Sequence, residues 1–193
     1  MQSRMRISFS LPTAVWLSLW LYYDKTGSAG CSICAACFHE FGHLLALRLL
    51  GETPHSLRIG ALGATIERVG TVHLTYTQEM IAAAAGPAAN LLLAGTLGCL
   101  MPLFPHLLLP VQVNLSLAAF NLLPLRVLDG GQFLYAALCR RMLPERARHI
   151  QKTIAVFACI PLTAIGVILF LRGYGGQSLL LSSLFALVSV VLP

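Results

Sequence analysis

Long apolar stretches separated by short polar connectors dominate this sequence of 193 residues. Hydrophobic residues make up 57% of the chain and charged residues only 10%, a balance outside the range of soluble globular domains. About 20 apolar residues in a helix cross the ~30 Å of hydrocarbon in a bilayer. The stretches that approach this length are 7–23, 29–50, 80–101, 106–124, 150–171 and 177–192. We therefore predict an all-α polytopic membrane protein with about six transmembrane helices, in a single integral-membrane domain over residues 1–193.

The basic residues are distributed as a topology signal. Thirteen Lys and Arg give a formal net charge of +6, a value that would also suit a nucleic-acid partner. With a cytoplasmic N-terminus and six crossings, eleven of the thirteen fall on the cytoplasmic side, and Lys25 and Arg172 fall outside. No basic stretch interleaves with aromatic residues as a nucleic-acid surface would. We predict a multi-pass protein of the cell membrane whose partner is the lipid bilayer and not nucleic acid.

The second apolar stretch contains the pentapeptide His39-Glu40-Phe41-Gly42-His43. Residues four apart lie on the same face of a helix, so the two imidazoles can bind one Zn²⁺ while Glu40 projects beside them as a general base. Three ionisable residues within five positions of an apolar helix are costly to insert unless a bound cation compensates. The alternative is a pair of buried histidines that only hydrogen-bond to their neighbours, and the same cost disfavours it.

A catalytic zinc site takes three protein ligands and an open position, so His39 and His43 leave one ligand to be found. Of the seven carboxylates, Glu40 is the expected base and Asp24 falls on the opposite side of the membrane. Four more lie in connectors or at span ends: Glu52, Glu67, Glu79 and Glu145. Elimination favours Asp129, which lies where a proline and two glycines break the end of the fourth apolar stretch. A helix N-cap or a surface turn would also suit an aspartate there.

The segment 51–79 is the longest stretch without a helical pattern. It contains several glycines and a proline, and polar and apolar residues alternate from Thr71 to Tyr76. We predict short strands there, as a membrane-surface β element after the second helix. Such an element could offer its edge to an extended substrate backbone, whereas the alternative is a plain hairpin that connects two spans.

Two other sets of residues in the apolar stretches have more than one interpretation. Asn90 ends the sequence Gly-Pro-Ala-Ala-Asn at membrane depth, where it would either hydrogen-bond another helix or line a water-accessible cavity. Cys31, Cys34 and Cys37 approach the spacing of an iron–sulfur site, but a fourth ligand at suitable spacing is missing. Small residues such as cysteine also allow close packing of membrane helices, which is the favoured interpretation.

The pentapeptide at 39–43, together with the later motif Asn121-x-x-Pro124-x-x-x-Leu128-Asp129-Gly130, resembles the site-2 protease family of intramembrane zinc metalloproteases. The resemblance runs from the first apolar stretch to the sixth. It is closest to the branch that contains the stage IV sporulation protease FB, but without the CBS domain usual there and without an inserted PDZ domain. It implies one Zn²⁺ per chain held by His39, His43 and Asp129, with Glu40 as general base and acid. Asn121 would position the substrate or stabilise the oxyanion.

The function implied by this resemblance is hydrolysis of a peptide bond in or near a transmembrane segment of a membrane-protein substrate, as in regulated intramembrane proteolysis. The basic residues place the site toward the cytoplasmic side, and a regulatory membrane partner is a further expectation. The alternative is a membrane metal transporter or sensor that uses the same His and Asp cluster. Glu40 favours the protease, because a transporter needs no general base beside a single closed site.

Overall fold

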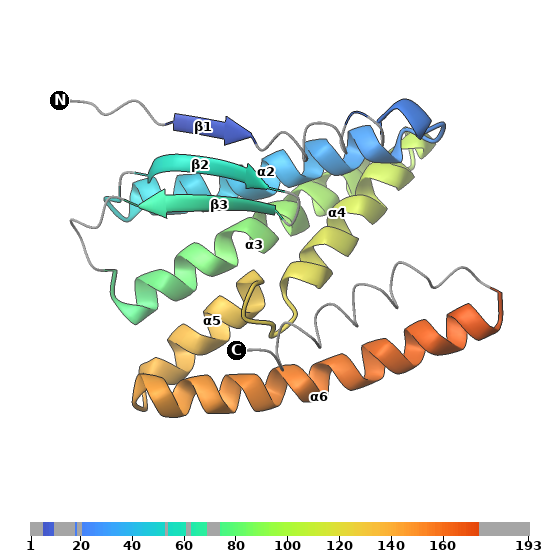
Figure 1. Ribbon diagram of the computed structural model, residues 1–193. Helices are drawn as coiled ribbons and strands as arrows, with labels where there is room; N and C mark the ends of the chain where they lie inside the picture. Colours follow the sequence, from blue (N-terminus) through green and yellow to red (C-terminus); the bar gives the residue numbers. More distant parts are fainter. Residues whose placement is uncertain are drawn as a thin grey trace. The chain divides into compact units, whose positions relative to one another are not determined.

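The computed structural model describes residues 6–9, 18, 21–52, 54–60, 63–68 and 74–173 (Figure 1). By its internal contacts the chain divides into two compact units, Met1–Ala119 and Phe120–Pro193. The single domain expected over residues 1–193 stays a prediction.

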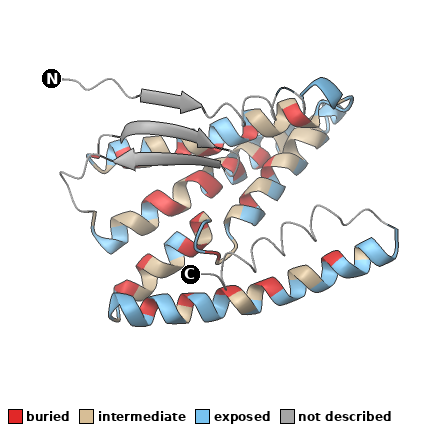
Figure 2. Cartoon of the chain, viewed as in Figure 1, coloured by how far each residue is buried: buried red, intermediate tan, exposed pale blue. Residues whose placement is uncertain are grey.

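Two long helices form the centre of the first unit. They are α2 (Ser28–Leu49) and α3 (Tyr76–Leu100), which pack along one another (Figure 1). A Cβ at Gly42 of α2 would lie 2.6 Å from the Ala85 carbonyl oxygen and 2.8 Å from Ala89 Cβ, so small residues permit the close approach. Other positions of the two helices are exposed (Figure 2). The large apolar residues among them include Phe41, Leu45, Ile81 and Leu92. Exposed apolar positions of this kind suit helices that contact lipid.

The first unit also contains a three-stranded sheet, whose central strand contacts α2. Its strands are β1 (Arg6–Phe9), β2 (Pro54–Gly60) and β3 (Gly63–Arg68), in the order β1-β2-β3 (Figure 1). β2 and β3 form an antiparallel hairpin, in which Gly60 is opposite Gly63. β1 pairs in parallel with β2. Parallel neighbours need a long crossover connection, and here the connection contains α2.

The strands differ in position from those that the sequence predicts. Short strands follow the second helix as expected, but they precede the alternating residues, and Tyr76 begins α3 instead. The reason is a capping box: the Gln78 side chain accepts a hydrogen bond from the Thr75 amide, and the Thr75 hydroxyl accepts one from the Gln78 amide. The start of the predicted span 7–23 was wrong, because β1 occupies it. Most of the rest of that span lies outside the described residues.

Three helices among the described residues are long and apolar enough to cross a membrane: α2, α3 and α6 (Pro144–Leu171). The predicted fourth span, 106–124, is not one of them. Its residues form a 3₁₀ turn, η1 (Pro105–Leu107), and α4 (Leu108–Asn121). At 1.5 Å per residue, the 14 residues of α4 reach about 21 Å, short of the ~30 Å hydrocarbon layer. The helix is short because the chain leaves it ahead of Pro124.

The second unit contains α5 (Asp129–Cys139) and α6, which pack against each other (Figure 1). α6 begins earlier than the predicted span 150–171, because Pro144 suits the first turn of a helix, where its missing N–H costs nothing. The predicted span 177–192 lies outside the described residues.

The carboxylate of Asp24 organises the turn before α2. One oxygen accepts hydrogen bonds from the Thr26 amide (2.9 Å), the Thr26 hydroxyl (2.7 Å) and the Ser28 hydroxyl (3.2 Å). The other accepts from the Ala29 amide at 2.7 Å. That amide is one of the N–H groups that a helix start leaves without an intrahelical acceptor, so Asp24 caps α2 although Gly27 is at the cap position. These bonds, the one from the Thr26 side chain foremost, lower the pKa of Asp24 from 3.8 to about 2.

We expect Asp24→Asn to reduce the hydrogen-exchange protection of the Ala29 amide at neutral pH, because a neutral acceptor replaces a charged one. The pKa of Asp24 is lowered in the folded state, so its stabilising contribution is complete above pH 3.8 and is lost as the pH falls through about 2. The difference in protection between wild type and variant should shrink across that window. Lys25→Gln, next to it in the same turn, is the control. Equal protection of the Ala29 amide in both proteins at neutral pH would contradict the capping role.

Candidate metal centre

His39 lies on the face of α2 that packs against α3, and it is 5% exposed. Its Nδ1 is 2.6 Å from Oδ1 of Asn90, a fully buried residue of α3. Nδ2 of Asn90 donates to the Ala35 carbonyl oxygen (3.0 Å) and to Oδ1 of Asn114 (2.7 Å). Because the Ala35 carbonyl can only accept, the Asn90 amide must turn its oxygen toward His39. Nδ1 of His39 therefore carries a proton, and in the neutral ring its Nε2 presents a lone pair.

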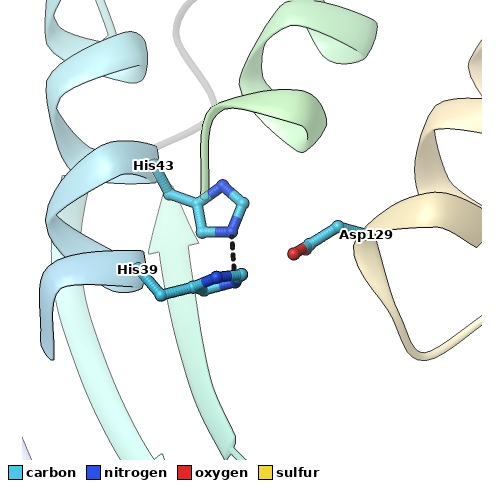
Figure 3. A group of neighbouring side chains, drawn as sticks. All are labelled: His39, His43 and Asp129. Atoms are coloured by element: carbon cyan, nitrogen blue, oxygen red, sulfur yellow. Dashed lines mark hydrogen bonds between the residues drawn. The ribbon is translucent and has the colours of Figure 1, made fainter. Parts of the chain in front are cut away.

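His43, one helical turn later, is held in the same way by a different acceptor. Its Nδ1 is 2.8 Å from the Ala82 carbonyl oxygen of α3, which again can only accept, so Nε2 of His43 also presents a lone pair. The two Nε2 atoms are 3.1 Å apart (Figure 3). In two neutral rings these lone pairs cannot hydrogen-bond to each other, whereas a cation between them can accept both. The donor set therefore fits a metal ion that binds neutral imidazole.

The space beside the two Nε2 atoms exists because residue 86 is glycine. A Cβ at Gly86 would lie 2.7 Å from Nε2 of His39, and it would also collide with Nε2 of His43. Ala82, Gly86 and Asn90 follow one another at intervals of four residues, which places them on one face of α3. That face supplies the acceptor for each Nδ1 and the room between the two imidazoles.

Asp129 comes from the second unit, in the first turn of α5, and it is 9% exposed. A helix N-terminus favours a carboxylate over its neutral form. Potential ligand atoms of His39, His43 and Asp129 lie within 4.8 Å of one another (Figure 3). Within the part of the chain that the structure describes, this is the one group of His, Cys, Asp or Glu side chains close enough together to hold a metal ion. It includes none of the cysteines at 31, 34 and 37.

Within the second unit, the turn that leads into α5 is tightly packed. A Cβ at Gly130 or at Gly131 would collide with carbonyl oxygens of the preceding turn, those of Leu122 and Leu125 respectively. The carbonyl oxygen of Gly131 accepts a hydrogen bond of 2.7 Å from Nε2 of Gln151 on α6. Close backbone approach therefore requires both glycines, and it fixes the start of the helix that carries the aspartate.

The two expected catalytic residues, Glu40 and Asn121, are both half-buried. Glu40 follows the first metal-binding candidate on α2, and Asn121 is the last residue of α4. Their roles stay predictions. Of the two interpretations of Asn90, the structure supports the hydrogen bond between helices. Gly86 and Asn114 were not assigned to the site from the sequence, although Asn114, an amide in an apolar stretch, carries the same signal as Asn90.

Known proteins resemble this chain in sequence and in fold. Residues 103–162 match the family model described as Peptidase family M50, a range that includes Asn121 and Asp129 but not the pentapeptide. Rip3 of Mycobacterium tuberculosis, a candidate zinc metalloprotease found in two strains, is 28% identical over 164 residues. The alignment covers 71% of this chain and 42% of Rip3, so the chain spans less than half the length of that relative.

A solved structure shows the same fold. The site-2 protease from Methanocaldococcus jannaschii superimposes with a TM-score of 0.68 over 99% of this chain and 91% of that one. The two sequences are 18% identical, so the likeness concerns the fold alone.

We expect Gly86→Ala to weaken zinc binding by more than about 100-fold, beyond the loss typical of removing an outer partner of a metal ligand. The added methyl group would occupy the space beside both Nε2 atoms. Metal content and competition with a chromophoric chelator measure the effect. Gly95→Ala is the matched control, because it lies on the same helix and its Cβ would meet nothing within 4 Å. Wild-type zinc affinity in Gly86→Ala would contradict a metal at this place.

Proposed function

We propose that this chain belongs to the M50 zinc metalloprotease family and is an intramembrane zinc metalloendopeptidase of the site-2 protease type. It hydrolyses a peptide bond in or near a transmembrane segment of a membrane-protein substrate. The observation that carries the proposal is the pair of facing imidazole lone pairs on α2, a helix long and apolar enough to cross a membrane. The family match supports the same activity.

The ligand set is the first part of the proposal. His39 and His43 would hold one Zn²⁺ through Nε2, with a carboxylate oxygen of Asp129 as the third ligand. The hydrogen bonds from each Nδ1 keep the rings in orientation, with Nε2 directed at the metal position. When bound, zinc would polarise a peptide carbonyl and make a water molecule acidic enough to lose a proton near neutral pH.

Glu40 and Asn121 are proposed to act on the reacting groups. Glu40 takes the proton from the attacking water and gives it to the nitrogen of the leaving amine, so that one carboxylate serves as base and then as acid. The oxygen of that water forms the new bond to the carbonyl carbon, and the C–N bond breaks. The Asn121 amide donates a hydrogen bond that positions the substrate or stabilises the oxyanion, an effect that is stronger where water is excluded.

The substrate must be extended at the bond that is cut, because a helix shields its own carbonyl groups. β3 is at the edge of the sheet, where its outer backbone groups can pair with another strand. We propose that an extended segment of the substrate adds to this edge, at the membrane surface.

The proposed orientation follows from the basic residues. The N-terminus is cytoplasmic in a multi-pass protein of the cell membrane, and the site lies toward the cytoplasmic side. Arg48, in the last turn of α2, supports this, because it is five positions beyond His43 at the same end of the helix. A regulatory membrane partner and placement in the branch of the stage IV sporulation protease FB are predictions from the sequence alone.

We expect Glu40→Gln to reduce cleavage of a co-expressed single-span substrate by about 100-fold or more, while zinc stays bound, because the variant keeps every proposed ligand but loses the base. Immunoblotting of the substrate and metal analysis of the purified protein measure the two effects. Glu145→Gln, at an exposed glutamate in the first turn of α6, is the matched control. Undiminished cleavage by Glu40→Gln would contradict the role of Glu40 as the general base. Zinc transport into liposomes with no cleavage of any substrate would favour the transporter.

We expect Asp129→Asn to lower zinc affinity by about 10- to 100-fold, because the amide keeps the shape of the side chain but loses the charge that a third ligand supplies. Asp129→Ala should lower it at least as far. Chelator competition measures the affinity, and Glu145→Gln, at an exposed glutamate in the first turn of α6, is the control. If both Asp129 variants bind zinc like the wild type, Asp129 is not a ligand and the third ligand lies elsewhere.

A further inference from the structure

A chain of buried amides connects α4 to the proposed ligand His39. Asn114 of α4 is 3% exposed, and its Nδ2 donates to the Pro110 carbonyl oxygen at 2.9 Å. Its Oδ1 accepts from Nδ2 of Asn90 at 2.7 Å, and Oδ1 of Asn90 accepts from Nδ1 of His39 at 2.6 Å. All four residues belong to the first unit.

The direction of every bond in this chain is fixed at its ends. The Pro110 carbonyl can only accept, so Asn114 turns its nitrogen toward it and its oxygen toward Asn90. The Ala35 carbonyl takes the other N–H of Asn90. With both N–H groups of Asn90 engaged, only its oxygen faces His39, which must donate from Nδ1.

We propose that Asn114 is a positioning residue for His39, which it holds in the metal-binding tautomer through Asn90. If the Asn90 amide turned over, it would offer an N–H to Nδ1 of His39. Nδ1 would then accept, and the ring proton would reside on Nε2, where it blocks a metal ion. The inference rests on the proposed zinc site and adds to it a residue of α4 that lies outside both sequence motifs.

Burial makes the contribution of Asn114 necessary. Asn90 is fully buried, so its second N–H must find its acceptor within the protein, and Oδ1 of Asn114 is that acceptor. If the Asn90 amide turned over, its oxygen would face two other acceptors, the Ala35 carbonyl oxygen and Oδ1 of Asn114. Both contacts therefore oppose the rotation.

His43 provides an internal reference for this proposal. Its Nδ1 donates to the Ala82 carbonyl, a backbone group that no side-chain substitution removes. A change that acts through Asn114 and Asn90 should therefore alter His39 and leave His43 as it was. A general loosening of the helices would alter both histidines together.

The test is nitrogen-15 NMR of histidine-labelled, zinc-loaded full-length chain in micelles, combined with zinc affinity from chelator competition. In Asn114→Leu we expect the zinc affinity to fall about tenfold, within the range for removal of a partner of a metal ligand. The Nδ1–H of His39 should exchange with solvent about tenfold faster, because its acceptor is less firmly held. The Nδ1–H of His43 should exchange at the wild-type rate.

Three further variants separate positioning from folding. Gln112→Leu makes the same amide-to-apolar change at an exposed site on α4 and should alter neither histidine. Asn114→Asp keeps the acceptor oxygen toward Asn90, and its second oxygen can donate to the Pro110 carbonyl only when it is protonated, so the protonated form should restore the His39 signal. If Asn114→Leu does not accumulate, Asn114→Ser replaces it, because a serine hydroxyl can still bond the Pro110 carbonyl within α4 but is too short to replace Oδ1.

The outcomes distinguish the two proposals. Unchanged zinc affinity and unchanged His39 exchange in the Leu or Ser variant, with zinc bound by the wild type, would overturn the role of Asn114 alone. Equal changes at His39 and His43 would also overturn it, since they indicate a loosened helix packing. If the wild type binds no zinc, the proposed function fails, and the positioning role fails with it.

Discussion

Two imidazole lone pairs that face each other across 3.1 Å are the constraint on which the rest of the first unit depends. Buried polar groups are tolerated when they have partners, and here each Nδ1 has an acceptor on α3. The arrangement leaves both Nε2 atoms directed at one place. A cation bound at that place would offset the free-energy cost of burying His39 and His43 in an apolar helix.

One face of α3 provides the contacts and the space that the two imidazoles need. Ala82 contributes a backbone carbonyl, Gly86 contributes the absence of a side chain, and Asn90 contributes an amide oxygen, at successive intervals of four residues. Gly42 on α2 lets the two helices approach closely enough for these contacts. In the second unit glycines have a comparable role, because they allow the turn before α5 to fold against its first residues.

The sequence predicts the parts of the site that depend on local spacing. His39 and His43 are one helical turn apart and Glu40 is next to His39, so helix periodicity alone places the three residues together. Asp129 could be selected by elimination among few carboxylates. Gly86 and Asn114 could not be found in this way, because their roles depend on contacts among α2, α3 and α4 that a single sequence does not reveal. The same holds for β1, whose partner β2 is more than forty residues away, and for α4, which is shorter than its apolar stretch.

X-ray absorption at the zinc edge, on the zinc-loaded chain, tests whether His39 and His43 hold the metal ion, because it reports the ligand atoms themselves. We expect a first shell of nitrogen and oxygen at about 2.0–2.1 Å, with the outer scattering of two imidazole rings and with no sulfur. A shell at about 2.3 Å would mean thiolate ligands and would contradict it, because the cysteines at 31, 34 and 37 would then hold the metal instead of His39 and His43.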